Sequence, residues 1–182
     1  MPRMKILNTI EQEAFESPPV FNSFQRKQYF DFPSAIQQAA ASLRTPVNHL
    51  CFLLSCGYFK ASKRLFPVQT FRSRDVEYVA ERAGLELEEI EPDQYPKGTA
   101  ARHQAWILDF YGFRAFRPHG HPLLVEEISR LVRSQLKPKQ ILWRCNQTTP
   151  ANLQHCRRRW VRAISATISE KWLGRSYFVE KR

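Results

Sequence analysis

Two closely spaced histidines are the first residues of this sequence that could do chemistry, because imidazoles are common metal ligands. The segment His119–His121 places one histidine on each side of a glycine, which would form half of a metal site. Pro118 and Pro122 flank the segment and favour a tight turn. No acidic or thiol ligand stands beside it at helical spacing. We therefore expect no metal ion here.

The carboxylates and cysteines also lack the spacing that catalysis or metal binding requires. Neighbouring glutamates at 88–89 and 126–127 would point away from each other on a helix. No cysteine belongs to a CxxC pair, which favours buried free thiols over a zinc site. No activated nucleophile and no glycine-rich phosphate loop is recognisable. The sequence thus predicts no catalytic residue, no metal and no cofactor. The cysteines are Cys51, Cys56, Cys145 and Cys156.

Charge is the stronger functional signal. The chain carries a net charge of +11 with a pI near 9.9. Residues 1–96 hold 11 Lys/Arg against 12 Asp/Glu, whereas residues 97–182 hold 17 against 5. This asymmetry favours a polyanionic partner, either nucleic acid or an anionic membrane surface. A basic surface that only keeps the protein in solution is the alternative.

Composition places the chain among soluble globular proteins. Its 182 residues are 43% hydrophobic and 25% charged, enough for one large domain or two small ones. No apolar run approaches the ~18 residues that a membrane helix needs. Polar residues from Asn8 onward interrupt any signal-peptide core. We expect a cytoplasmic protein that does not bind membranes.

The stretch from Thr45 to Gly84 is the one around which the other elements are expected to pack. Thr45 and Pro46 are helix-start signals before the apolar run 47–54, and Gly84 closes a second amphipathic helix. Two helices joined by a cationic connection could form a helix-turn-helix-like unit facing a polyanion, although plain helical bundles share this pattern. The cations of the connection are Lys60, Lys63, Arg64, Arg72 and Arg74.

Helical periodicity recurs along the chain, and strict alternation is absent. We predict an all-α helical bundle with helix-turn-helix-like units in two small subdomains, residues 1–92 and 98–182, with a divergent tail after about 146. The expected helices are residues 6–15, 21–30, 34–43, 47–54, 76–83, 85–91 and 99–111, with others starting at 122, 141 and 150. An extended link is expected at 113–118, where aromatics alternate with cations.

Several cations of the second half are candidate phosphate or base contacts. Thr99 is the predicted cap of a helix whose first turn carries Arg102 and His103, opposite its aromatic face. A solvated polar face is the alternative for both residues. The other candidates are Arg114 and Arg117 in the link, and Arg157 and Arg158 in a later basic run.

Several of these motifs, taken in order, resemble the N-terminal domain of the large Tn-three family transposases, which move class II replicative transposons. The likeness covers roughly residues 1–145. The residues that carry it are Met1-Pro2-Arg3, Ile6-Leu7, the segment from Arg44 to Tyr58 with Asn48, Phe52 and Gly57, then Tyr95, Thr99, Arg102-His103, and Tyr111 to Phe116. The sequence from Asn146 onward departs from the family pattern.

The resemblance implies an all-helical region that binds double-stranded DNA at the transposon's terminal inverted repeats. It also implies a nucleoid-associated location. The family's Mg-dependent acidic catalytic domain has no counterpart in this sequence, so the resemblance implies DNA binding without catalysis. Two other hypotheses stay open at this point. One is an active nuclease or transposase, and the other is a protein-interaction module, such as a regulator of a full-length transposase.

Overall fold

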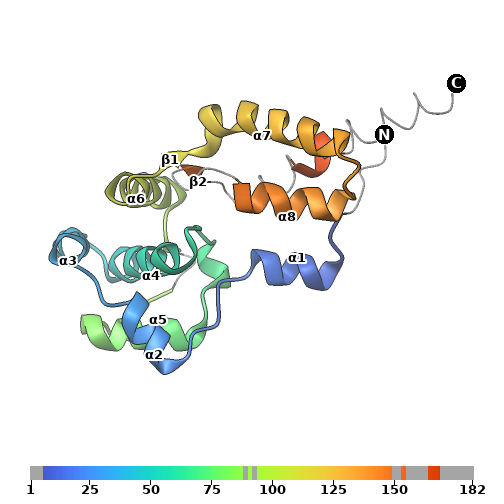
Figure 1. Ribbon diagram of the computed structural model, residues 1–182. Helices are drawn as coiled ribbons and strands as arrows, with labels where there is room; N and C mark the ends of the chain where they lie inside the picture. The colour runs from blue at the N-terminus through green and yellow to red at the C-terminus, as the bar shows by residue number, and fades with distance from the viewer. Residues whose placement is uncertain (1–5, 88–89, 92–93, 149–152, 155–163, 169–182) are drawn as a thin grey trace, which may run out of the picture. The chain divides into compact units, whose positions relative to one another are not determined.

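The computed structural model describes residues 6–87, 90–91, 94–148, 153–154 and 164–168. These residues form an all-α protein, as predicted (Figure 1). The helices are α1 (Thr9–Glu16), α2 (Ser23–Tyr29), α3 (Ser34–Ala41), α4 (Pro46–Ser62), the 3-10 helix η1 (Val68–Thr70), α5 (Ser73–Ala83), α6 (Lys97–Phe110), α7 (Phe116–Arg133) and α8 (Pro138–Thr148). Residues 164–168 are helical too.

The chain divides into two compact units. One is residues 17–111, which hold α2 to α6, and the other joins residues 1–16 to residues 112–182. The predicted break near residues 92–98 is therefore misplaced, because α6 packs against α4 and belongs to the first unit. The N-terminal helix α1 belongs to the second unit instead. The 17–111 unit and the terminal unit are described separately below.

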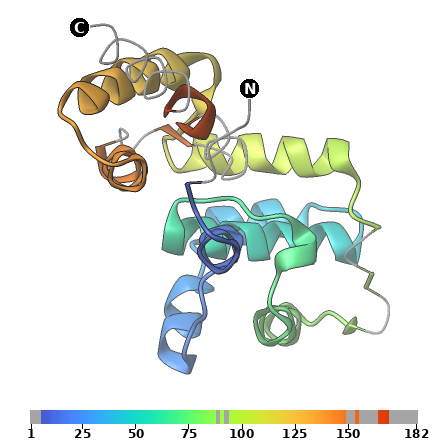
Figure 2. The ribbon, with the colours of Figure 1, turned by 90° about the vertical axis from the view of Figure 1, so that its right-hand side faces the viewer.

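Helix α4 is the centre of the 17–111 unit, as its apolar run predicted. It contacts α2, α3, α5 and α6, and Figure 2 shows α6 lying alongside it. Every residue from Leu50 to Phe59 is buried, which is expected of a helix that is apolar all round. The predicted cap is confirmed, since Thr45 Oγ1 accepts a hydrogen bond from the Asn48 amide at 3.3 Å and Pro46 is the first helical residue.

Aromatic rings pack closely against the middle of α4. The ring of Phe30 lies 5.8 Å from the rings of Phe21 and Tyr58, edge-on to both. It also lies directly over Gly57, where a Cβ atom on residue 57 would come within 2.2 Å of two ring carbons. A glycine is therefore required at this point of α4 for the aromatic cluster to form.

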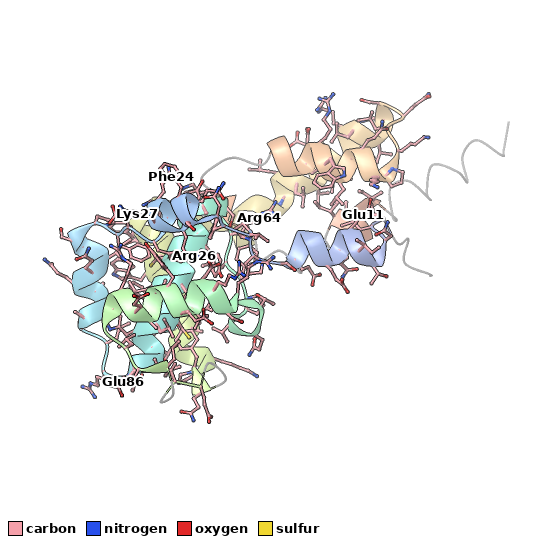
Figure 3. The ribbon with its side chains drawn as sticks, turned by 90° about the horizontal axis from the view of Figure 1, so that it is seen from below. Glu11, Phe24, Arg26, Lys27, Arg64 and Glu86 are labelled. Carbon is pink, nitrogen blue, oxygen red and sulfur yellow. The ribbon has the colours of Figure 1, made fainter. Side chains whose placement is uncertain are left out.

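A buried ion pair joins α2 to α5. Asp75 is fully buried and accepts hydrogen bonds from Arg26 Nε at 2.7 Å and from the Tyr58 hydroxyl at 2.8 Å. The Arg26 side chain, marked in Figure 3, is itself only 14% exposed. Because both charged groups are removed from water, each depends on the other for its stabilisation.

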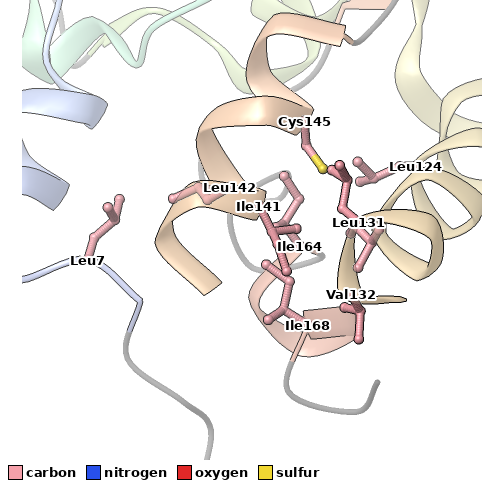
Figure 4. Packing of buried hydrophobic residues seen from close by; sticks show 10 residues of the cluster. Leu7, Leu124, Leu131, Val132, Ile141, Leu142, Cys145, Ile164 and Ile168 are labelled. Atoms are coloured by element: carbon pink, nitrogen blue, oxygen red, sulfur yellow. The ribbon is translucent and has the colours of Figure 1, made fainter. Parts of the chain in front are cut away.

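The core of the terminal unit lies between α7, α8 and the helical residues 164–168, with Leu7 contributed by the segment before α1 (Figure 4). Ile128, Ile141, Ile164 and Ile168 are fully buried in it. An ion pair between Glu11 and Lys139 also ties α1 to α8.

The segment between α6 and α8 differs from the prediction. Only Arg114 and Ala115 are extended; they pair in parallel with Leu153 and Gln154 as the two-residue strands β1 and β2. Helix α7 then begins at Phe116, so neither the extended link to residue 118 nor the turn at 119–121 forms. The first proline of α7 lies in its first turn, where its missing N–H is of no consequence.

Three further boundaries differ. Helix α6 begins at Lys97, so Thr99 lies inside the helix and Pro96 precedes it. The described residues 85–87 and 90–91 are not α-helical. Residues 153–154, within the helix expected from residue 150, form β2 instead. Propensity and capping signals favour these helices locally, but contacts formed elsewhere decide whether they form.

Candidate functional site

Two of the predicted cations of the α4–α5 connection hold backbone in place. Lys60 Nζ donates to the carbonyl of Gln28 at 2.8 Å and to that of Asp31 at 2.7 Å, at the end of α2. The Arg72 guanidinium donates to the carbonyls of Pro18 and Pro19, at 2.8 Å for its shortest bond. These donors satisfy carbonyls that lie in the last turn of α2 or outside the helices, where carbonyls lack an amide partner within a helix. Both side chains therefore have a structural task.

The other three cations of the connection differ in exposure. Arg64 is half-buried, and the resulting desolvation lowers the pKa of its guanidinium (Figure 3). Lys63 is exposed at the end of α4, with Nζ 5.4 Å from the centre of the Tyr111 ring. Arg74 is exposed in the first turn of α5 and has no polar partner among the described residues. The connection thus presents two cations to solvent rather than five.

Arg102 and His103 point to different environments, contrary to the prediction that both lie opposite the aromatic face of α6. Arg102 is exposed, and its Nη2 donates to Thr99 Oγ1 at 3.1 Å. His103 is only 9% exposed, with its Nδ1 2.6 Å from the Tyr95 hydroxyl and its ring edge-on to Phe52. His103 lies one helical turn before the buried Ile107, so the buried face of α6 includes position 103.

Burial also affects the charge of His103. Desolvation, followed by the nearby positive charge of Arg102, lowers the pKa of the imidazole. The ring is therefore neutral at pH 7. A neutral, buried imidazole bonded to a tyrosine is a packing element and does not have the geometry of a phosphate contact.

A groove of about 420 Å³ lies beside Arg102 in the 17–111 unit. Its walls come from the segment after α3, from the first turns of α4 and from α6. Arg44 and Arg102 are its two exposed cations, and none of the described residues that line it is acidic. Asn48 and Phe52 of α4 line it as well, and Trp106 of α6 completes it.

Asn48 is unusual among the residues of this groove. Its Oδ1 is the one buried side-chain oxygen or nitrogen of the described residues that has no hydrogen-bond partner. Buried acceptors are nearly always paired, and leaving one unpaired costs on the order of 1–3 kcal/mol. An exception of this kind in a cavity that carries cations marks a position where a ligand could supply a donor.

An exposed aromatic pair extends from the groove along α6. The rings of Trp106 and Phe110 stack with centroids 5.1 Å apart and planes 9° apart. They are 36% and 39% exposed, respectively, although large aromatic side chains are usually buried. Trp106 also packs edge-on against Phe52 at 5.2 Å, which holds its ring in place. The pair offers a flat surface on which another ring could stack.

The basic excess belongs to the terminal unit. Residues 1–16 and 112–182 hold 17 Lys/Arg against 7 Asp/Glu, and residues 17–111 hold 11 against 10. Arg133 at the end of α7 and Lys137 just before α8 are exposed, and their side chains have no ion-pair partner among the described residues. Arg130 is also exposed but pairs with Glu127 at 2.8 Å.

Four predicted contacts in this unit cannot be given side-chain positions. Arg114 is the first residue of β1 and Arg117 the second of α7, but the orientation of their side chains is not described. Arg157 and Arg158 lie outside the described residues.

The described residues contain no group of three or more His, Cys, Asp or Glu side chains that could hold a metal ion. Cys51, Cys56 and Cys145 are free and buried, as predicted, and burial raises the thiol pKa of the first and last to about 12. Cys156 lies outside the described residues. None of the described helices is long and apolar enough to span a membrane.

Sequence reasoning missed the groove because its residues come from three separate segments. Asn48 did carry a local signal, since it is a polar residue within an apolar run. Arg44 lies directly before the cap of α4 and carried no local signal of a binding role. Neither was assigned a binding role.

Comparison with known proteins gives one family. No curated protein matches the chain. Residues 6–150, by contrast, match a family that is described as Domain of unknown function (DUF4158). The match spans α1 to α8 and includes the groove and the two exposed cations at Arg133 and Lys137. The chain belongs to the family described as Domain of unknown function (DUF4158).

Proposed function

We propose that this protein is a DNA-binding module that binds double-stranded DNA mainly through its phosphates, without catalysing strand cleavage or joining. The observation that carries the proposal is the placement of charge. The terminal unit has 10 more basic than acidic residues, whereas the 17–111 unit has an excess of one. A concentration of Lys and Arg on one part of a protein attracts polyanions and speeds their association.

The described side chains of the terminal unit support this reading. Arg133 and Lys137 extend into solvent with no carboxylate among the described residues to neutralise them. Exposed, unpaired cations of this kind contact phosphates and release counterions on binding. In the 17–111 unit, the exposed candidates are Lys63, Arg74 and Arg102, whereas Lys60 and Arg72 donate to backbone carbonyls of distant segments.

The resemblance of the motifs to the N-terminal domain of Tn-three family transposases supplies the sequence preference. On this proposal the DNA is a terminal inverted repeat of a class II transposon, and the protein is associated with the nucleoid. Base reading would then add to the phosphate contacts that position the protein. A full-length transposase is a further proposed partner.

The test is a titration of terminal-repeat and random duplexes at two salt concentrations. If about four to six phosphates are neutralised, log K should fall against log salt with a slope of roughly −4 to −5. The double variant Arg133→Gln/Lys137→Gln should make that slope shallower by about 2. The matched control is Lys27→Gln/Arg82→Gln, which removes two exposed positive charges from the other unit.

The results separate the three hypotheses. A control slope equal to that of the parent, with a shallower slope for the test variant, supports phosphate binding by the terminal unit. Absence of any salt-dependent DNA binding would refute the proposal and favour a protein-interaction module. Mg-dependent cleavage that is lost on replacing a carboxylate of this chain would favour an enzyme instead.

A further inference from the structure

We propose that the groove between α3, α4 and α6 binds one unpaired nucleotide that carries an exocyclic amine, with adenine as the best fit. This inference rests on the proposed function, because it names a second mode of contact with the same nucleic acid. The groove is defined by Arg44, Asn48, Phe52, Arg102, His103 and Trp106.

Size and charge point to a single nucleotide. A volume of about 420 Å³ lies within the range of about 300–1,000 Å³ that small-ligand sites occupy, and it is too small for a duplex. Arg44 and Arg102 reach the groove from different elements, and both are exposed. Guanidinium groups are well suited to the oxygens of a phosphate. No acidic side chain among the described lining residues opposes an anion.

The aromatic wall supplies the surface for a base. Trp106 is partly exposed, and its ring is held on one side by Phe52 and stacked on Phe110. Unpaired bases stack on aromatic side chains of this kind, whereas the bases of an intact duplex are already stacked on each other. An extrahelical base, or one at a strand end, is therefore the form of DNA that the groove would take.

Asn48 supplies the selectivity. Its Oδ1 lines the groove region as a buried acceptor without a donor. After a small rotation of the Asn48 side-chain amide, an exocyclic amine on the bound base could donate a hydrogen bond to Oδ1. Adenine combines such an amine with an adjacent ring nitrogen that accepts from the amide NH₂, which is the usual asparagine–adenine pairing. Unsubstituted purine, which is adenine without its exocyclic amine, has no donor on this edge and would leave Oδ1 unsatisfied.

The experiment compares three duplexes that differ at one position, in a fluorescence anisotropy titration. One is fully paired, one carries an extrahelical adenine and one an extrahelical unsubstituted purine. We expect the parent to bind the adenine duplex about ten-fold more tightly than the paired one, since stacking of one base has about this effect. The purine duplex, which keeps the ring but lacks the amine, should fall between them.

Variants of the groove locate the effect. Arg44→Gln should remove most of the preference for the extrahelical base while leaving binding of the paired duplex within about two-fold. Arg102→Gln should remove the preference too; because Arg102 is also a candidate contact to the paired duplex, its readout is the ratio of the two affinities. Asn48→Ala should bind the adenine and purine duplexes equally. The variant should also fold normally, because the Asn48 side-chain oxygen makes no hydrogen bond in the parent. The backbone N–H of residue 48 still donates to Thr45 Oγ1 in the variant. Lys27→Gln is the control for loss of one exposed positive charge on the same unit.

Free deoxyadenosine monophosphate distinguishes failure of this inference from failure of the proposed function. Equal binding of all three duplexes by the parent, or an unchanged preference in Arg44→Gln and Arg102→Gln, would overturn the groove assignment and leave DNA binding intact. Binding of deoxyadenosine monophosphate that Asn48→Ala weakens, without any duplex binding, would support the groove and refute the proposed function. Binding of neither ligand would refute both.

Discussion

Replacing Gly57 by alanine should destabilise the 17–111 unit, although the same change usually stabilises a helix. Alanine is favoured over glycine inside a helix by about 1 kcal/mol. At position 57 a Cβ would lie 2.2 Å from two carbons of the Phe30 ring, whereas ordinary contacts begin near 3.4 Å. The ring would have to retreat by about 1 Å. Whether Gly57→Ala stabilises or destabilises the unit depends on whether the Phe30 ring can move by this distance.

The surroundings of Phe30 indicate that it cannot move freely. Its ring is 3% exposed and lies within 6.3 Å of the rings of Phe21, Phe32, Tyr58 and Tyr78. Overpacking a core of this density costs roughly 1–3 kcal/mol, and a clash with two ring carbons belongs at the upper end. After subtracting the helix-propensity gain, the expected loss in the free energy of unfolding is about 2 kcal/mol.

Urea unfolding followed by tryptophan fluorescence would measure this loss. Trp106 is the one tryptophan between residues 17 and 111, so the other three are replaced by phenylalanine in parent and variants alike. The matched control is Gly98→Ala in α6, where a Cβ would meet nothing within 4 Å. That change should be neutral or stabilise the unit by about 0.5 kcal/mol.

A second variant tests the cause. Phe30→Leu makes room beside residue 57, so adding Gly57→Ala to it should cost less than adding it to the parent. If Gly57→Ala stabilises the unit as much as Gly98→Ala does, the ring adapts and the argument from packing is refuted. Equal costs of Gly57→Ala in both backgrounds would show that Phe30 is not the obstacle.

Two other perturbations test the buried polar groups of the same unit. Asp75→Ala should lower the free energy of unfolding by about 3–5 kcal/mol, because it leaves Arg26 and the Tyr58 hydroxyl buried without their acceptor. The control is Asp109→Ala at an exposed position, which should lower it by less than about 0.5 kcal/mol in the same urea assay. Similar losses for both would show that the ion pair contributes little. Burial lowers the pKa of His103 below its value in the unfolded chain, so its contribution to stability is complete above about pH 6.5 and is lost as the pH falls through the folded pKa. His103→Gln should therefore make the free energy of unfolding fall less steeply as the pH is lowered. The pKa of His49 is also lowered, but His49 is present in parent and variant alike and so does not affect the comparison. An equally steep fall in the variant would contradict a buried, neutral His103.

The sequence alone predicted those features that depend on near neighbours in the chain. Thr45 and Pro46 start α4, and Gly84 ends α5 with a φ of 65°, because capping involves groups within a few residues of each other. The buried position of α4 followed from its apolar run. The free, buried state of Cys51 followed from the same run.

Position in three dimensions decided what each charged residue does. Lys60 and Arg72 looked like phosphate contacts in the sequence, yet they donate to carbonyls at residues 28 and 31 and at 18 and 19. Asp75 showed no local signal of burial, because its partner Arg26 is 49 residues away. A charge is stabilised by groups close in space, and chain order does not reveal them.

The same reason separates His103 from Arg102. The two are adjacent in α6, yet one is buried and the other is exposed. On a helix, neighbouring side chains point about 100° apart, so the packing of α6 on α4 determines which of them is covered. The groove depends on that packing too, because residues 44, 48, 102 and 106 meet only when three segments come together. Local signals therefore determined the start of α4 and the end of α5, and only the packing of the helices determined which polar side chains are free to bind.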